Sequence, residues 1–507
     1  MAGILTDVLG WGGIGVHTSP MWGVGAALLL GGVTPLVIVE RNNSHVDALT
    51  LLLAGGLVML AACQLGWILG TAKGEKFAAA MFWVFVYIFA GLAPLVQIAL
   101  DAYPFDNRIY PGDLVATALV HLWIGIIAYL VGGALWTSLR RTVDAHKDGS
   151  RQTRQPWQFS QAQTVVVALV GLTAVGWKVW GYGVSAFFVS RQQTTNILTG
   201  QGLNTLDPFY TVENKTSGFV SIFLTQYLVF AALFVILYSR HHRLWERTRP
   251  RRIDVYLVPP LIVANLIVNN PIGSPRMWFF VVLVGFASIY VPYYRGANIR
   301  LYVVGALVLL LFAFTFLDAF RWNKGPAEAG GSITRKLATD PSYPVLQMHL
   351  NGMEYVRVHG YTGGEQLLGA VFGLVPRSLW ADKPIATGQV VDRYLRSTSL
   401  WTEGYIDFGI PGIVMLLLMA GAATAWLSNA ARRAAPGLLH ATFPMLVMLQ
   451  LYVLRGSLMP SLATVYQLML AVALTVAWGQ RTTKPATLPT VRSRTNAWSR
   501  TRSGSIP

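Results

Sequence analysis

Arginine and amide side chains gather in a polar stretch that reads VSRQQTTNILTGQGLNTLDPF. It contains Arg191, Gln192, Gln193, Asn196 and Gln201. Amide and guanidinium groups donate hydrogen bonds to sugar hydroxyls, and a guanidinium binds phosphate through two parallel bonds. The stretch is therefore a candidate site for a phosphorylated sugar. Solvation of an ordinary loop explains the same composition equally well.

A second group of charges follows a short apolar run in the stretch LLGAVFGLVPRSLWADKP. The run is about ten residues long, which is too short to cross a bilayer. Its apolar residues end at Arg377, Asp382 and Lys383. This pattern predicts an interfacial or re-entrant segment that holds Arg377 and Lys383 near lipid headgroup phosphates. Arg393 and Arg396 follow it.

Two acids come next, in the stretch LWTEGYIDFGIPG, where they are Glu403 and Asp407. A carboxylate at a membrane border can act as a general base or can pair with a nearby arginine. Of these two roles, the ion pair is the one we favour.

Two histidines, His349 and His359, lie ten positions apart, with Glu354 and Arg357 between them. No common pair of metal ligands on one helix has that separation, so we expect no metal and no other cofactor. These histidines can transfer protons or can be structural, and we favour the structural role.

Arg276 lies at the end of an apolar run, in the stretch NNPIGSPRMWFF. Such an arginine either extends to the lipid headgroups or forms an anion site. Several motifs are missing from the sequence. It has no phosphate-binding glycine-rich loop with its lysine and no Gly-x-Ser-x-Gly motif. The stretch RNNSHVD carries one acid, Asp47, rather than the paired acids of a metal-dependent lipid-linked sugar transferase.

These residues must be positioned by a membrane domain. The 507 residues are 54% hydrophobic and 12% charged, whereas a soluble domain is roughly 25% charged. The only cysteine, Cys63, lies inside an apolar run, which excludes an intramolecular disulfide. We therefore predict an all-α polytopic protein with one transmembrane domain over residues 1–480 and a basic, disordered tail over residues 481–507.

About twelve apolar runs are long enough to cross a hydrocarbon core of about 30 Å. The predicted spans are residues 21–40, 48–70, 78–100, 113–136, 162–182, 218–238, 254–270, 277–293, 299–320, 405–428, 438–455 and 457–478.

The placement of the basic residues predicts the orientation. Of the 39 lysines and arginines, 23 fall in alternate connections or in the tail, on one side of the twelve-span arrangement. The positive-inside rule makes that side cytoplasmic, together with both termini. The net charge of +17 thus reflects topology rather than nucleic-acid binding. Two long connections, residues 183–217 and 321–404, are predicted to lie outside, where long loops usually carry function.

The chain resembles the Wzy-type polysaccharide polymerases, which are related in architecture to the O-antigen ligases. The polymerase signature is an arginine followed after ten residues by a glycine, in the third and in the fifth outer loop. Arg191 with Gly202 and Arg377 with Gly388 have that spacing. VPRSLWADKP followed by EGYIDFGIPG is also similar to the polymerase pattern. The similarity of motifs covers residues 190–412, although no histidine here aligns with the ligases' histidine.

The resemblance implies a bacterial cytoplasmic-membrane glycosyltransferase that joins polyprenyl-diphosphate-linked oligosaccharide units on the outer face. Arg377, Arg191 and Arg276 would stabilise the departing diphosphate without metal. Glu403 or His359 would activate the acceptor hydroxyl. The substrate-binding residues would be Lys383, Gly202, Gly388, Arg393, Arg396 and Gln192. A chain-length regulator and membrane lipid are the implied partners.

Two other functions remain open. A ligase would transfer finished polymer from the same kind of donor to a different acceptor. A transporter or flippase of lipid-linked sugars would show inverted repeats and ionisable residues near the bilayer middle. The chain has Lys178, Pro259 and Pro260 in or near spans but no evident repeat.

Overall fold

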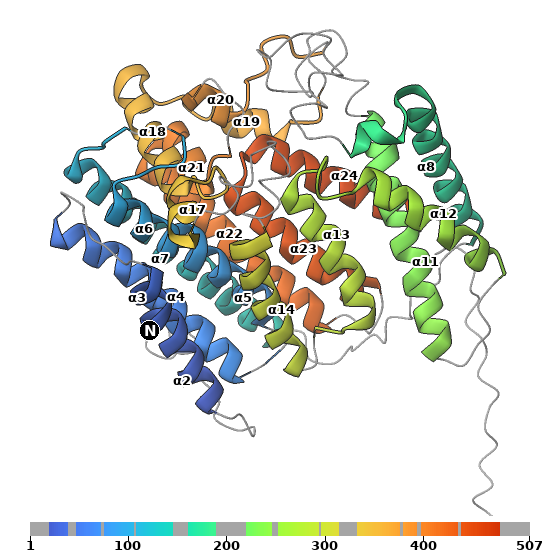
Figure 1. Cartoon of the computed structure of the whole chain (residues 1–507), viewed down its shortest axis with the longest axis horizontal. Helices are drawn as coiled ribbons and strands as arrows, with labels where there is room; N and C mark the ends of the chain where they lie inside the picture. The colour runs from blue at the N-terminus through green and yellow to red at the C-terminus, as the bar shows by residue number, and fades with distance from the viewer. Residues whose placement is uncertain are drawn as a thin grey trace, which may run out of the picture.

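The computed structural model shows a helical protein, with no β-strand in the residues that it describes (Figure 1). The described residues are 20–38, 47–71, 73, 76–105, 108–145, 161–188, 220–245, 252–293, 296–313, 332–375, 379–392, 397–433 and 438–476. The predicted tail and most of the predicted outer loop 183–217 lie outside them.

Each predicted span falls on a helix or on a set of consecutive helices. In the first half of the chain these are α2 (Pro20–Leu28), η1 (Leu29–Val33) and α3 (Thr34–Ile38), α4 (Ala48–Thr71), α5 (Phe77–Phe85), η3 (Val86–Leu92) and α6 (Ala93–Leu100), α7 (Gly112–Ala145), and α8 (Gln161–Tyr182). In the second half they are η5 (Phe223–Tyr227) and α11 (Leu228–Trp245), α12 (Arg252–Val268), α13 (Arg276–Tyr290), α14 (Gly296–Val308) and η6 (Leu309–Ala313), α22 (Ile410–Arg433), α23 (Leu438–Arg455), and α24 (Leu458–Val476).

Seven of the described helices are long and apolar enough to cross a membrane. Four further apolar helices are shorter, at 10–17 residues. A helix satisfies its backbone hydrogen bonds internally, which is why an apolar run of this length is stable in lipid as a helix. The multi-pass helical character is therefore confirmed, whereas the number twelve and the cytoplasmic placement of both ends stay predictions.

The centre of the molecule is the segment Phe77–Leu100. In its most apolar stretch of 18 residues, 94% is buried inside the protein. Around it, α7 and α22 approach closely at their glycines. A Cβ atom on Gly421 would lie 1.9 Å from the Tyr129 carbonyl oxygen, and one on Gly132 would lie 2.0 Å from the Leu418 oxygen. Small residues allow two helix backbones to pack this closely where lipid offers no hydrophobic driving force.

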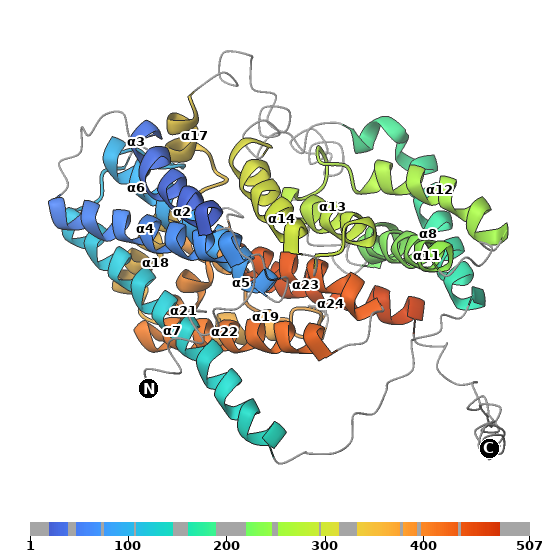
Figure 2. The ribbon, with the colours of Figure 1, turned by 90° about the horizontal axis from the view of Figure 1, so that it is seen from below.

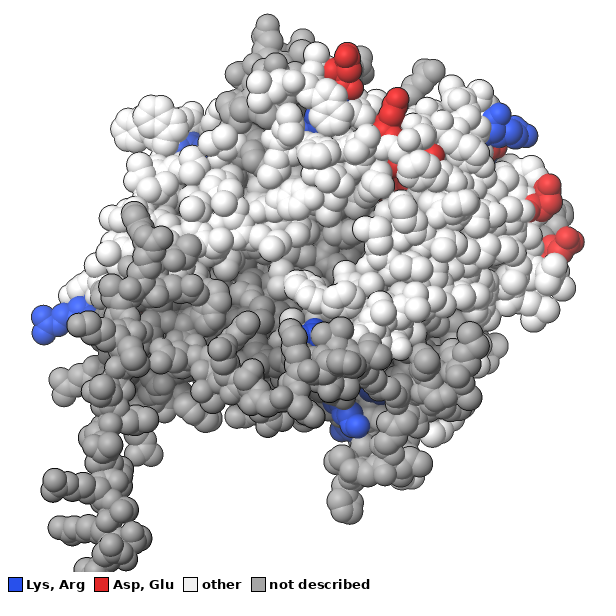
Figure 3. Space-filling model, turned by 180° about the vertical axis from the view of Figure 1, so that it is seen from behind, with Lys and Arg blue, Asp and Glu red and all other residues white. Residues whose placement is uncertain are grey.

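Helices α8, α11 and α12 share a second, smaller core that includes Ala168, Val229 and Leu261. They lie together at the right of Figure 2. Many large apolar side chains are exposed, among them Leu36, Trp180 and Leu301. On the described part of the face in Figure 3, charged side chains are few, and the acidic ones lie in the upper half and at the right edge. An extended apolar surface is typical of a protein that contacts lipid.

Five short helices form much of the segment that was predicted as the loop 321–404. They are α17 (Ile333–Thr339), α18 (Val345–His359), α19 (Glu365–Val371), α20 (Thr387–Asp392) and α21 (Leu400–Phe408), at the upper left of Figure 1. The predicted span 405–428 begins too early, because α21 ends at Phe408 and α22 begins at Ile410. Gly409 separates them with φ 68°, a conformation that glycine adopts without strain.

Candidate functional site

Two arginines from different helices bind the same residue, Ser342. Arg276, the first residue of α13, donates from Nη1 to the Ser342 hydroxyl at 2.8 Å. Arg455, the last residue of α23, donates from Nε and Nη2 to the Ser342 carbonyl oxygen at 3.0 and 2.8 Å. The two guanidinium groups are close enough to interact electrostatically. We call Arg276, Arg455 and Ser342 the arginine cluster.

Local sequence explains why each arginine lies there. Pro275 precedes α13 in an extended conformation, so the helix begins at Arg276. After Arg455, Gly456 makes the tight connection to α24, and a Cβ atom on it would lie 2.5 Å from the Ser461 hydroxyl oxygen. The Ser342 turn is closed by Asp340, whose Oδ1 accepts from the Ser342 N–H at 2.7 Å.

Two guanidinium groups lie close together in the cluster. Among the described residues, the charges of Arg276 and of the Asp340 carboxylate both act on Arg455. Arg276 is only 9% exposed and Asp340 only 7%. Two guanidinium groups at a buried position repel each other, so an anion bound between them would be stabilised. Guanidinium groups suit phosphate because they stay protonated and bind two oxygens at once.

Glu403 is buried beside this cluster and is enclosed by donors. Its Oε1 accepts from the Thr398 hydroxyl at 2.5 Å, the Ser457 hydroxyl at 2.9 Å and the Leu458 N–H at 2.9 Å. Its Oε2 accepts from the Thr387 hydroxyl at 2.5 Å. Burial raises the pKa of the Glu403 carboxyl, and these hydrogen bonds oppose that rise.

These contacts change the role expected for Glu403. Its partners in the described part of the chain are neutral hydroxyl and N–H groups, so the favoured ion pair does not form there. Ser457 and Leu458 follow Arg455 by two and three positions. Glu403 therefore fixes the α23–α24 connection, which directly follows Arg455 and helps to position it.

Asp407 lies one helical turn after Glu403 and acts as a helix cap. It accepts from the Thr362 hydroxyl at 2.5 Å, the Gln366 N–H at 3.2 Å and the Leu367 N–H at 2.9 Å. The last two N–H groups belong to the first turn of α19, where they have no partner inside the helix. Asp407 thus fixes the start of α19.

Lys383 acts at the other end of α19. Its Nζ donates to the carbonyl oxygens of Gly373 at 2.6 Å and Val375 at 3.0 Å. Both residues follow the last residue of α19, Val371, so Lys383 fixes the turn by which the chain leaves the helix. Gly388, the other described residue of the predicted substrate site, is buried in α20 next to Thr387.

The two predicted histidines do not converge. His359 is exposed and stacks on Tyr355, with ring centroids 4.5 Å apart. His349 is fully buried, and its Nε2 lies 3.1 Å from Nδ1 of His121 on α7. Its own Nδ1 has no partner in the described structure. Burial, together with the neighbouring His121, lowers the pKa of His349 to about 3. No group of three or more potential metal ligands occurs among the described residues.

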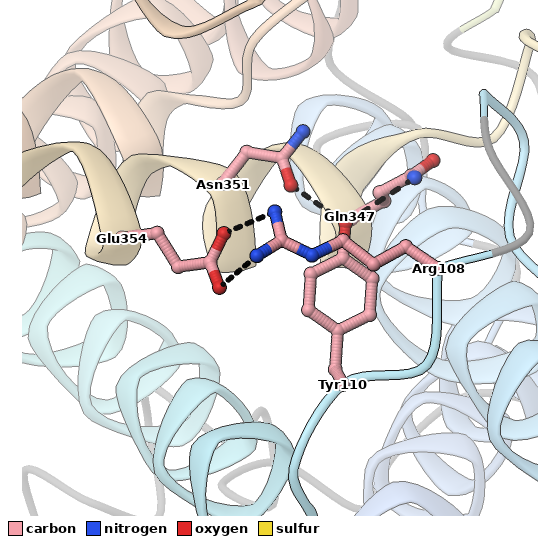
Figure 4. A network of polar contacts seen from close by, with 5 residues as sticks. All are labelled: Arg108, Tyr110, Gln347, Asn351 and Glu354. Atoms are coloured by element: carbon pink, nitrogen blue, oxygen red, sulfur yellow. Dashed lines mark hydrogen bonds and ion pairs between the residues drawn. The ribbon is translucent and has the colours of Figure 1, made fainter.

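Glu354 has an ion-pair partner that sequence analysis did not identify. Its two oxygens bind the two terminal nitrogens of Arg108 at 2.7 and 2.9 Å (Figure 4). Beside this pair, the Tyr110 hydroxyl donates to Asn351 at 2.6 Å. These contacts fasten the segment before α7 to α18.

Six of the predicted site residues lie outside the described structure. They are Arg191, Gln192, Gly202, Arg377, Arg393 and Arg396. The paired arginine-to-glycine spacing is therefore not tested by geometry.

Sequence reasoning missed Arg455, Asp340 and His121. Arg455 did carry a signal, because it ends an apolar run just before a glycine, at the border where Arg276 also lies. His121 sits alone within an apolar span, where an ionisable residue is itself a functional hypothesis. Asp340 gave no signal of its place beside Arg455, because the two residues are distant in the chain.

The fold and the site define a multi-pass α-helical membrane protein with an arginine-rich polar cluster at one end of its helices. The chain matches no protein-family profile, no curated protein and no solved structure.

Proposed function

We propose that this protein is a glycosyltransferase of the bacterial cytoplasmic membrane, which polymerises polyprenyl-diphosphate-linked oligosaccharide units on the outer face. The observation that carries the proposal is the convergence of Arg276 and Arg455 on Ser342. The motif similarity over residues 190–412 supports it independently.

The main task of the protein in this reaction is to stabilise the leaving diphosphate. An acceptor hydroxyl attacks the anomeric carbon of the donor, the bond from that carbon to the diphosphate oxygen breaks, and negative charge builds on the leaving diphosphate. Guanidinium groups placed at that charge stabilise the transition state without metal. Arg276 and Arg455 supply two such groups, and Arg377 and Arg191 are proposed to supply more.

The acceptor hydroxyl must lose a proton during the transfer. Glu403 is enclosed by four donors, so accepting that proton would require breaking contacts that hold the α23–α24 connection. His359 is exposed and its ring is accessible. We therefore assign acceptor activation to His359 and a positioning role to Glu403.

Reconstitution with lipid-linked oligosaccharide tests the proposal. The wild-type protein should produce a ladder of chain lengths, and Arg455→Ala should abolish it while protein level and membrane insertion stay normal. Arg335→Ala is the matched control, because Arg335 lies in the same region but is exposed. Transfer of preformed polymer to a different acceptor would instead favour a ligase. Movement of intact substrate across the bilayer without a ladder would favour a flippase.

A further inference from the structure

An apolar surface surrounds α19 at the end of the molecule that carries the arginine cluster. It consists of Tyr361, Leu368, Val371, Phe372, Phe408 and Ile410, each at least 40% exposed. We call these six side chains the α19 patch. Large apolar side chains that gather on a surface mark an interaction site.

The α19 patch is continuous across elements that are separate in the chain. The N–H groups of Thr362 and Gly363 donate to the carbonyl oxygens of Ile406 and Asp407 at 3.0 and 3.1 Å. A Cβ atom on Gly364 would lie 2.6 Å from the Phe408 ring. The start of α19 thus packs directly on the end of α21, which joins the two parts of the patch.

The rest of the protein holds α19 with this face outward. A Cβ atom on Gly369 would lie 2.9 Å from the Met459 side chain, so the face that contains the buried Gly369 and Ala370 is packed on α24. Asp407 caps the first turn, and Lys383 binds the carbonyls beyond the last turn. A seven-residue helix is not stable alone in water. These contacts therefore fix both the helix and the direction in which Leu368 and Phe372 point.

The α19 patch also continues into the outward surface of a candidate span. Phe408 and Ile410 lead directly into α22, whose exposed positions Pro411, Met415 and Met419 follow at helical spacing. In the most apolar 18-residue stretch of α22, only 33% is buried inside the protein. In a span, such a stripe faces lipid hydrocarbon. The patch extends this lipid-facing stripe beyond the end of the span.

We propose that the α19 patch is embedded in the bilayer leaflet at this end of the helices, where it contacts lipid acyl chains. Burying apolar side chains at the interface is favourable in proportion to the apolar area removed from water. The short helix then lies along the membrane surface, with the exposed Asp382 beyond it on the aqueous side. This inference does not depend on the proposed glycosyltransferase activity.

Site-directed spin labelling tests the inference without an activity assay. The chain has a single cysteine, so Cys63→Ala gives a cysteine-free background. Leu368→Cys and Phe372→Cys carry the label in turn, with the protein in phosphatidylcholine vesicles. Their ratio of oxygen to nickel-chelate collision rates should be several-fold higher than that of a label at the exposed Asp382→Cys. It should approach the ratio of a Met419→Cys label.

Two results would overturn the proposal. Labels at Leu368 and Phe372 that behave like the Asp382 label would place the patch in water. Labels shielded from both reagents would place it against protein, and dipolar broadening between labels would identify a second copy of the chain as the occupant. Val371→Cys replaces either variant that fails to insert, so that one patch residue is always measured.

Discussion

Arg276 and Arg455 donate hydrogen bonds to the same residue, one to the hydroxyl and the other to the carbonyl oxygen of Ser342. These bonds fix the start of α13 and the end of α23 to the turn that contains Ser342. Two like charges are held together there, with Asp340 as the nearby acid. Under the proposed function, the diphosphate of the donor would offset the repulsion between the two guanidinium groups.

The shape of the guanidinium should matter as well as its charge. Arg455→Lys keeps the charge but cannot make both bonds to the Ser342 carbonyl, so we expect polymer formation to fall about 10²-fold or more. Gel analysis of product ladders with a fixed amount of protein measures this. Arg335→Lys should retain wild-type activity, and equal losses in the two variants would show a general effect of arginine replacement.

Glu403→Gln should destabilise the protein. The amide places an NH₂ group among donors that previously faced a carboxylate, which leaves buried donors without acceptors. We expect a loss of about 1–3 kcal/mol of unfolding free energy, together with reduced activity through Arg455. Thermal unfolding in detergent measures the first effect. Asp382→Asn is the exposed control, and an unchanged melting temperature in Glu403→Gln would contradict the positioning role.

Acid should destabilise the protein through His349. Its pKa is about 3 when folded, against 6.5 for an ordinary histidine. Between those values the unfolded chain binds more protons, so stability falls as the pH drops below about 6.5, by up to about 1.4 kcal/mol per pH unit. Melting temperatures at pH 7 and pH 5 should differ less in His349→Gln than in the wild type. The same pH dependence in both proteins would rule out this cause.

Close packing of α7 and α22 should make Gly421 intolerant of a side chain. A Cβ atom there would lie 1.9 Å from a backbone oxygen, and backbone cannot move away as a flexible side chain can. We expect Gly421→Ala to cost at least about 1–3 kcal/mol. Gly305→Ala in α14 is the control, because no atom lies within 4 Å of its Cβ position. Equal melting temperatures for the two variants would refute the close contact.

The ion pair between Arg108 and Glu354 should matter little by contrast. The Arg108 side chain is 53% exposed, so water and salt screen the pair. Glu354→Gln should change the unfolding free energy by less than about 1 kcal/mol. A large loss that is insensitive to salt would show that this contact is more important than its exposure suggests.

The sequence by itself determined the helices and their apolar character, since each helix satisfies its own backbone hydrogen bonds and long apolar runs need no distant partner to form one. It also identified Arg276 and Glu403 as residues of interest.

Only the tertiary structure decided what they touch. Arg455 joins Arg276, and His121 joins His349, because packing brings together helices that are far apart in the chain. Glu403 and Lys383 are polar groups that the sequence leaves without a defined partner. The fold surrounds Glu403 with neutral donors and places Lys383 at the end of α19, because a buried charge is stable only where hydrogen bonds compensate for the water it has lost.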